Sequence, residues 1–114
     1  MAKILIIDDD EGMRYSLSVL VKKLGHNPRC ASFLAEGLHA ASSTPFDVIL
    51  LDVNLPDGNG LSSLPEFRTS PAGPEIIIIT GYGNPDGAEL AIRTGAWDYI
   101  QKGASLKVII VPVI

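Results

Sequence analysis

The sequence predicts one α/β domain in which helices cover both faces of a doubly wound, flavodoxin-like sandwich with a five-stranded parallel sheet. Three short runs are wholly apolar and rich in β-branched residues, namely Ile4–Ile7, Val48–Leu51 and Ile76–Ile79. Such runs are typical of strands that are buried on both faces of a parallel sheet. Segments with helical periodicity separate these runs, and 114 residues suffice for a single domain.

Two weaker strands complete the predicted sheet. Arg29–Ser32 follows the Asn27-Pro28 turn, and Trp97–Gln101 follows Gly95. Because strands that alternate with helices form right-handed crossovers, we expect the strand order 2-1-3-4-5.

The first two helical segments have clear ends. Apolar residues recur at spacings of three and four from Met13 to Leu24, and Gly25 suits a left-handed helix end. The second segment covers Phe33 to Ala41, with Ser32 as the predicted N-cap and an end before Pro45.

The later helical segments are less regular. Leu61 to Arg68 should form a short or displaced helix, because Pro65 is tolerated only in the first turn. Asn84 to Gly95 has an N-cap residue, a proline at the first helical position and a glycine stop. The tail from Ala104 to Ile114 is β-branched and contains a proline, so we expect an incomplete last helix. Residues 1–114 would then be either a piece of a longer protein, with a C-terminal effector domain, or a chain with an atypical end that packs on another chain.

Composition excludes several classes of function. Thirteen acids against nine Lys and Arg give a net charge of −4, so direct nucleic-acid or anionic-membrane binding lacks its usual electrostatic basis. No apolar stretch approaches the roughly 20 residues that a bilayer requires. Cys30 is the only cysteine, which excludes an internal disulfide. We therefore expect a cytoplasmic protein.

Polar residues follow the predicted strands. Asp8 and Asp9 come directly after the first apolar run, Asp52 after the second, Thr80 after the third, and Lys102 just after the last predicted strand. Parallel strands end at one edge of the sheet, where ligands bind in this fold class. These residues should therefore form one pocket.

The chemistry of this pocket indicates a divalent cation. Carboxylates a few ångströms apart repel each other by about 1 kcal/mol or more per pair. Oxygen ligands without thiolates or imidazoles suit Mg²⁺ better than Zn²⁺. A carboxylate can also serve as the nucleophile that forms an aspartyl phosphate.

The pattern resembles the receiver domain of two-component response regulators, from residue 3 to about residue 107. The matching parts are Asp8-Asp9, Asp52 within Leu-Leu-Asp-Val-Asn-Leu-Pro-Asp-Gly-Asn-Gly, Thr80 before a glycine, and Lys102 after Gly-Ala-Trp-Asp-Tyr-Ile-Gln. The stretches Thr80–Gly83 and Gly95–Tyr99 are most similar to receivers attached to ATPase-type transcription activators.

The resemblance implies a role for each acidic residue. Asp52 would accept a phosphoryl group from a phosphohistidine on a sensor histidine kinase. Asp9 and Asp52 would bind Mg²⁺ directly, Asp8 through water, and Asn54 through its backbone carbonyl.

The resemblance also implies a switch. Thr80 and Lys102 would contact the phosphoryl oxygens, and Tyr99 would swing inward when Thr80 is drawn to the phosphate. This movement would change contacts with partners, among them an ATPase or DNA-binding effector domain and a second copy of the chain. Beyond its own phosphorylation and slow dephosphorylation, no conventional enzyme activity is expected. One departure is Gly103, because family members usually have proline after the lysine.

Each residue also has a simpler interpretation. Asp8 to Asp10 could cap the first helix, and Asp52 could form a turn. Asp10, Glu11 and Asp57 fit solvated loop charges better than ligands. Thr80 could reflect strand propensity, Lys102 could be a surface residue, and Tyr99 could be a half-buried core aromatic.

Three rival functions remain open. An aspartate-nucleophile phosphatase would have an Asp-x-Asp motif after the first strand, whereas Asp52 follows the middle run and position 54 is asparagine. A flavin-binding, flavodoxin-like module is the second rival, although the sequence has no glycine-rich phosphate loop after its first strand. A receiver that no longer takes phosphate is the third alternative.

Overall fold

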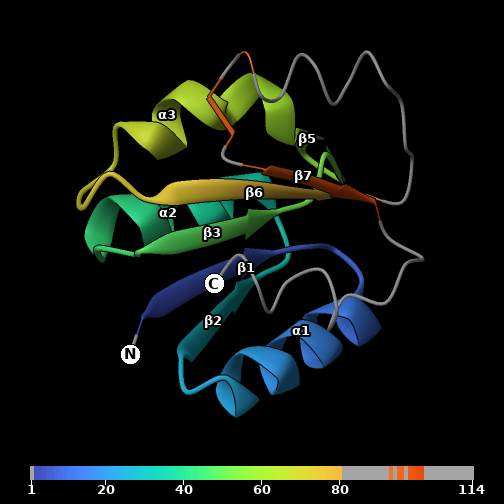
Figure 1. Cartoon of the computed structure of the whole chain (residues 1–114). Helices are drawn as coiled ribbons and strands as arrows, with labels where there is room; N and C mark the ends of the chain where they lie inside the picture. Colours follow the sequence, from blue (N-terminus) through green and yellow to red (C-terminus); the bar gives the residue numbers. More distant parts are fainter. Residues whose placement is uncertain (1, 81–92, 94, 97, 102–114) are drawn as a thin grey trace.

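The computed structural model describes residues 2–80, 93, 95, 96 and 98–101, and its centre is a five-stranded parallel sheet (Figure 1). The strands, in spatial order, are β2 (Asn27–Ala31), β1 (Lys3–Ile7), β3 (Val48–Leu51), β6 (Glu75–Thr80) and β7 (Asp98–Gln101). Every neighbouring pair in this sheet is parallel. The predicted fold class and strand order are therefore confirmed.

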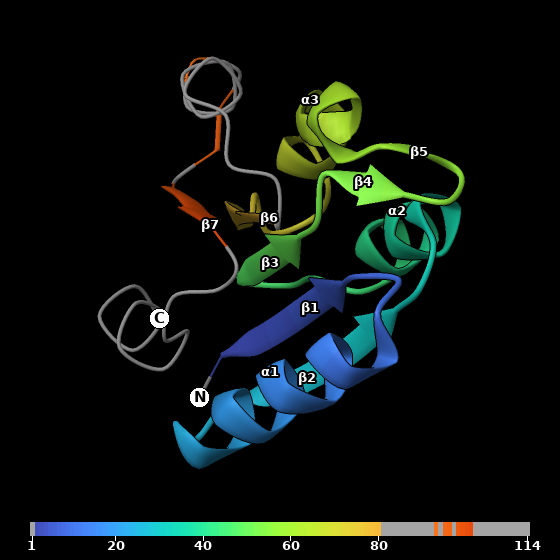
Figure 2. The same cartoon turned by 90° about the vertical axis from the view of Figure 1, so that its right-hand side faces the viewer.

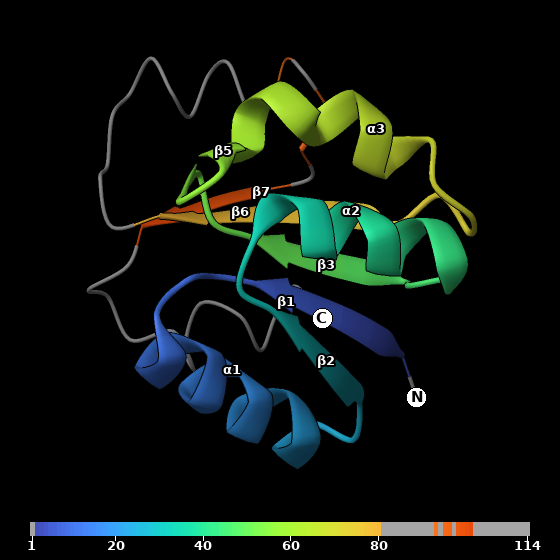
Figure 3. The same ribbon diagram turned by 180° about the vertical axis from the view of Figure 1, so that it is seen from behind.

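Helices cover both faces of the sheet. The helix α1 (Glu11–Lys23) lies against one face, and α2 (Leu34–Ser43) and α3 (Leu64–Arg68) lie against the other (Figures 2 and 3). A single 3₁₀ turn, η1 (Gly60–Ser63), leads directly into α3. The predicted shortness of this third helix is confirmed, and Pro65 occupies its first turn.

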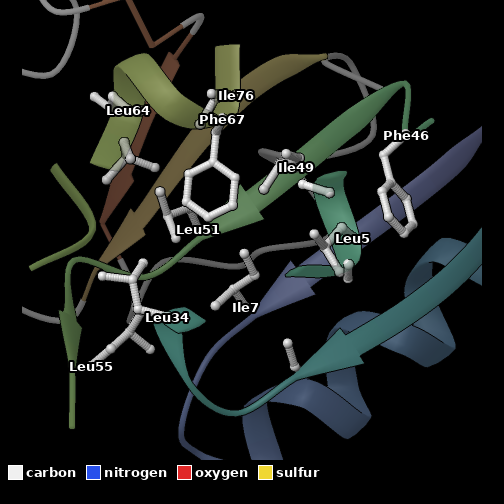
Figure 4. Packing of buried hydrophobic residues seen from close by; sticks show 14 of the residues in the cluster. Leu5, Ile7, Leu34, Phe46, Ile49, Leu51, Leu55, Leu64, Phe67 and Ile76 are labelled. Carbon is white, nitrogen blue, oxygen red and sulfur yellow. The ribbon is translucent and has the colours of Figure 1, made fainter. Parts of the chain in front are cut away.

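The strands supply a core on each face. Alternate residues of β1 point to opposite sides, so Ile4 and Ile6 join the α1 side while Leu5 and Ile7 join the α2 and α3 side. On the second side, Phe67 of α3 packs among aliphatic side chains of the sheet (Figure 4). The continuous apolar runs are explained by this burial on both faces.

The first helix ends where the sequence predicts, and it starts at Glu11, two residues before the predicted apolar spacing begins. The side chain of its N-cap, Asp10, accepts a hydrogen bond from the Met13 amide at 3.2 Å. Gly25 follows the helix with φ +87°, a left-handed conformation that glycine adopts without steric cost.

The predicted cap of the second helix is wrong. The N-cap is Phe33, which makes no side-chain cap hydrogen bond. Ser32 instead uses its amide to donate to Oε1 of Glu36 at 2.6 Å. The first amides of α2 are satisfied by a residue distant in sequence, Asp57, described below.

Two further differences concern strands. The second strand covers Asn27–Ala31 instead of Arg29–Ser32, and Pro28 is accepted because β2 is an edge strand. An unpredicted antiparallel hairpin, β4 (Asn54–Leu55) and β5 (Gly58–Asn59), follows β3. Two-residue strands are too short to produce a recognisable alternation.

Several predictions lie outside the described residues. These are Trp97 of the last strand, the tail from residue 104 to 114, and the helix over 84–95 apart from its end, where Gly95 has φ +120°. Within the part of the chain that the structure describes, no helix has the length and apolar character needed to cross a membrane.

We expect Phe67→Ala to lower the free energy of unfolding by about 3–5 kcal/mol, because it leaves a cavity in the core. Phe67 is 0% exposed, whereas Phe33 is 49% exposed. Phe33→Ala should lower the free energy of unfolding by about 1 kcal/mol or less. Urea denaturation of both variants measures the difference, and equal losses would contradict the assigned core.

Candidate functional site

The carboxyl ends of β1 and β3 lie side by side. Ile7 pairs with Leu51, and the amide of Asp52 donates to the carbonyl of Ile7 at 2.9 Å. Asp8 and Asp52 directly follow these strands and are 2% and 6% exposed. The sheet register therefore brings together two residues that are 44 positions apart in the sequence.

Three carboxylates form a cluster at this edge. One oxygen from each of Asp8, Asp9 and Asp52 lies within 4.8 Å of the others, and Asp9 is exposed while its neighbours are buried. No other group of three or more potential metal-ligating side chains occurs among the described residues. Carboxylate oxygens at this spacing are suitable ligands for a hard divalent cation such as Mg²⁺.

Local hydrogen bonds order the first part of this cluster. Oδ1 of Asp8 accepts from the Asp10 amide at 3.0 Å. The guanidinium of Arg14 donates to the backbone carbonyl of Asp8 at 2.8 Å. Sequence reasoning missed Arg14, which is the fourth residue of α1 and lies close to the end of β1. Asp10 itself caps α1, in agreement with the simpler interpretation.

The segment after Asp52 turns back over the backbone of Asp52. The Gly60 amide donates to the carbonyl of Val53 at 2.7 Å. A Cβ atom at Gly60 would lie 2.4 Å from the carbonyl oxygen of Asp52, so no other residue fits without backbone movement. Asn54 begins β4 two residues after Asp52, and its side chain is exposed.

The remaining predicted residues lie on or beyond the neighbouring strands. Leu51 pairs with Ile78, so β6 continues for two residues past that pair and ends at Thr80 on the same edge. Tyr99 belongs to β7 and pairs with Ile78. The side chains of Thr80 and Tyr99, and all of Lys102, lie outside what the structure describes.

Asp57 has a structural role that the sequence analysis missed. Its side chain is exposed, as expected for a loop charge, but its oxygens accept from the amides of Leu34 at 2.7 Å and Ala35 at 2.9 Å. The Ala35 amide, followed by that of Leu34, lowers the pKa of Asp57 from its ordinary 3.8. This carboxylate therefore stabilises the fold above pH 3.8, and its contribution is lost as the pH falls through the lowered pKa.

A separate hollow is unrelated to the acidic cluster. It has a volume of about 520 Å³, lies between α2 and the end of α3, and includes Leu38, His39 and Glu66 in its lining. None of the three clustered aspartates borders it. The carboxylates at the sheet edge are therefore the candidate site.

Comparisons with known proteins agree with this geometry. The family model of the response regulator receiver domain matches residues 4–113. The regulatory protein AtoC of Escherichia coli is 33% identical over 100 residues, which make up 88% of this chain and 22% of AtoC. The chain thus spans about a fifth of the length of that relative.

Solved structures are similar over nearly the whole chain. The beryllofluoride-activated NtrC4 receiver domain dimer has a TM-score of 0.90 and 32% identity, covering 99% of this chain and 93% of that one. A response regulator from Burkholderia pseudomallei, with a phosphorylated aspartic acid, a calcium ion and citrate, has a TM-score of 0.89 and 28% identity. That match covers 97% of this chain and 65% of the other. The sheet order, the carboxylate cluster and the family match together establish that this chain belongs to the response regulator receiver domain family.

Proposed function

We propose that this chain is a phosphorylation-dependent signalling switch in which Asp52 receives a phosphoryl group from a phosphohistidine of a sensor histidine kinase. The observation that supports this most directly is the cluster of Asp8, Asp9 and Asp52, whose oxygens lie within 4.8 Å of one another. The solved relative from Burkholderia pseudomallei contains a phosphorylated aspartic acid, which is consistent with the same chemistry.

The donor set fits Mg²⁺. Asp9 and Asp52 would bind it directly, Asp8 through water, and Asn54 through its backbone carbonyl. Only oxygen atoms are offered, and a positive charge would offset the repulsion among the three carboxylates. When bound, Mg²⁺ supplies that charge and offsets the negative charge on the oxygens of a phosphoryl group.

The transfer step makes one bond and breaks one bond. A carboxylate oxygen of Asp52 attacks phosphorus and forms an O–P bond, while the N–P bond of the phosphohistidine breaks and the imidazole leaves with the electron pair. The backbone of Asp52 is held by its hydrogen bond to Ile7, and the residue is only 6% exposed. We assign Thr80 and Lys102 to the stabilisation of the phosphoryl oxygens.

The output of the switch is a change in partner contacts. Thr80 ends β6, and Tyr99 lies on the adjacent strand β7, which offers a short route from the phosphoryl group to the edge of the sheet. We propose that this route changes contacts with a second copy of the chain and with an ATPase or DNA-binding effector domain that regulates transcription. Two relatives support this proposal. The matched region makes up only 22% of AtoC, and the NtrC4 receiver domain is a dimer. The reaction would take place in the cytoplasm.

We expect the wild-type protein, incubated with Mg²⁺ and acetyl phosphate, to gain one phosphoryl group per chain by intact-mass measurement. Asp52→Asn should gain none, because an amide oxygen is a poor nucleophile. Asp47→Asn is the matched control, because Asp47 lies away from the cluster, next to the amino ends of β1 and β3, where its side chain accepts a hydrogen bond from the Lys3 amide at 2.8 Å.

The outcome separates the rival functions. A folded wild-type protein that gains no phosphoryl group would favour a receiver-like binding module that no longer takes phosphate. Gly103, which follows Lys102, would then be the first residue to replace with proline. Turnover of an ordinary phosphomonoester would instead favour an aspartate-nucleophile phosphatase.

We also expect Mg²⁺ to raise the melting temperature. At a hundredfold excess over its dissociation constant, a ligand of the native state adds about 2.7 kcal/mol to the free energy of unfolding. Asp9→Asn should reduce this shift, and without Mg²⁺ it should melt no lower than wild type, because one repulsive charge is removed. Differential scanning calorimetry tests both statements. The same melting temperature with and without millimolar Mg²⁺ would argue against the metal site.

A further inference from the structure

Asp57 connects the segment after the phosphoacceptor to a helix that lies elsewhere in the fold. Its two carboxylate oxygens accept from the amides of Leu34 at 2.7 Å and Ala35 at 2.9 Å, in the first turn of α2. These amides have no partner within the helix, and the N-cap residue Phe33 provides no side-chain acceptor. The connection spans 23 and 22 residues of sequence, so it is a tertiary contact.

The hairpin that carries Asp57 also carries Asn54. In this hairpin Asn54 pairs with Asn59, and Leu55 pairs with Gly58. Leu55 is buried in the same core cluster as Leu34 (Figure 4), and a Cβ atom at Gly58 would lie 2.9 Å from Cδ2 of Leu34. The tip of the hairpin is therefore packed against the start of α2 as well as hydrogen-bonded to it.

The base of the hairpin is held at Asp52. The Gly60 amide bonds to the carbonyl of Val53 at 2.7 Å, and Gly60 lies in contact with the Asp52 backbone. Residues 52–60 thus form a closed segment that is fixed at its base by the phosphoacceptor and at its tip by Asp57. Among the described residues, Asp57 makes the side-chain hydrogen bonds that tie this tip to the rest of the domain.

We propose that Asp57 is a positioning residue for the metal site, which fixes the hairpin so that the Asn54 carbonyl and the Asp52 carboxylate are correctly placed for Mg²⁺. This inference depends on the proposed function. Mg²⁺ demands near-ideal octahedral geometry, so a loosely held ligand lowers its affinity. Groups that orient the direct ligands of a metal commonly affect affinity about 10–100-fold.

Two substitutions and a matched control test the proposal. Asp57→Ala should weaken Mg²⁺ binding by about tenfold, measured by isothermal titration calorimetry on protein whose fold is verified by circular dichroism. Asp57→Asn keeps one of the two oxygen acceptors at the helix start, so its affinity should lie between those of Asp57→Ala and wild type. Asp47→Ala also removes one negative charge and one side-chain acceptor of a backbone N–H group. It should leave the Mg²⁺ affinity unchanged.

A second measurement uses the wild-type chain alone. If the contact favours Mg²⁺ binding, Mg²⁺ must favour the contact by the same factor. Hydrogen exchange at the amides of Leu34 and Ala35 should therefore slow when Mg²⁺ is added. Exchange at the Lys3 amide, which donates a hydrogen bond to Asp47, should not change.

The outcomes distinguish this proposal from the one on which it rests. If wild type takes up phosphate but Asp57→Ala binds Mg²⁺ as tightly as wild type, only the positioning role is overturned. Equal weakening by Asp57→Asn and Asp57→Ala would assign the effect to charge and overturn it as well. If Mg²⁺ does not slow hydrogen exchange at the Leu34 and Ala35 amides of the wild type, the positioning role is also overturned. This measurement holds even if Asp57→Ala does not fold. If wild type neither binds Mg²⁺ nor takes up phosphate, both proposals fail.

Discussion

The parallel pairing of β1 with β3 is the constraint on which the site depends. Both strands are buried on both faces, and a shift of one residue would turn their apolar side chains out of the two cores. Because this register is strongly specified, β1 and β3 end at a pair of neighbouring residues, Ile7 and Leu51. Asp8 and Asp52 must then lie together, despite the repulsion between their charges.

Carboxylates have two separate roles in this domain. Those at the sheet edge are concentrated, which suits a cation, whereas Asp10 and Asp57 each satisfy amides at the start of a helix. A helix start offers unpaired N–H groups, which a carboxylate can satisfy. Acidic residues close together in sequence, such as Asp9 and Asp10, can therefore serve different purposes.

Much of the fold could be predicted from sequence because its signals are local. The apolar runs located β1, β3 and β6, the spacing from Met13 to Leu24 located α1, and Pro65 predicted a short α3. Predictions failed where a partner was distant. Ser32 was the best nearby cap for α2, but Asp57 from the hairpin takes that role, and the edge strand β2 begins at Asn27 because pairing with β1 outweighs the proline.

The sequence by itself determined the fold class, the strand order and which acidic residues follow the strands, because burial on two faces leaves a strong pattern of apolar runs. The tertiary structure alone decided that one oxygen from each of three aspartates lies within 4.8 Å, that Arg14 contacts the backbone of Asp8, and that Asp57 joins the hairpin to α2. These contacts depend on side-chain directions and on backbone amides far apart in the chain, and neither is encoded in the spacing of residue types.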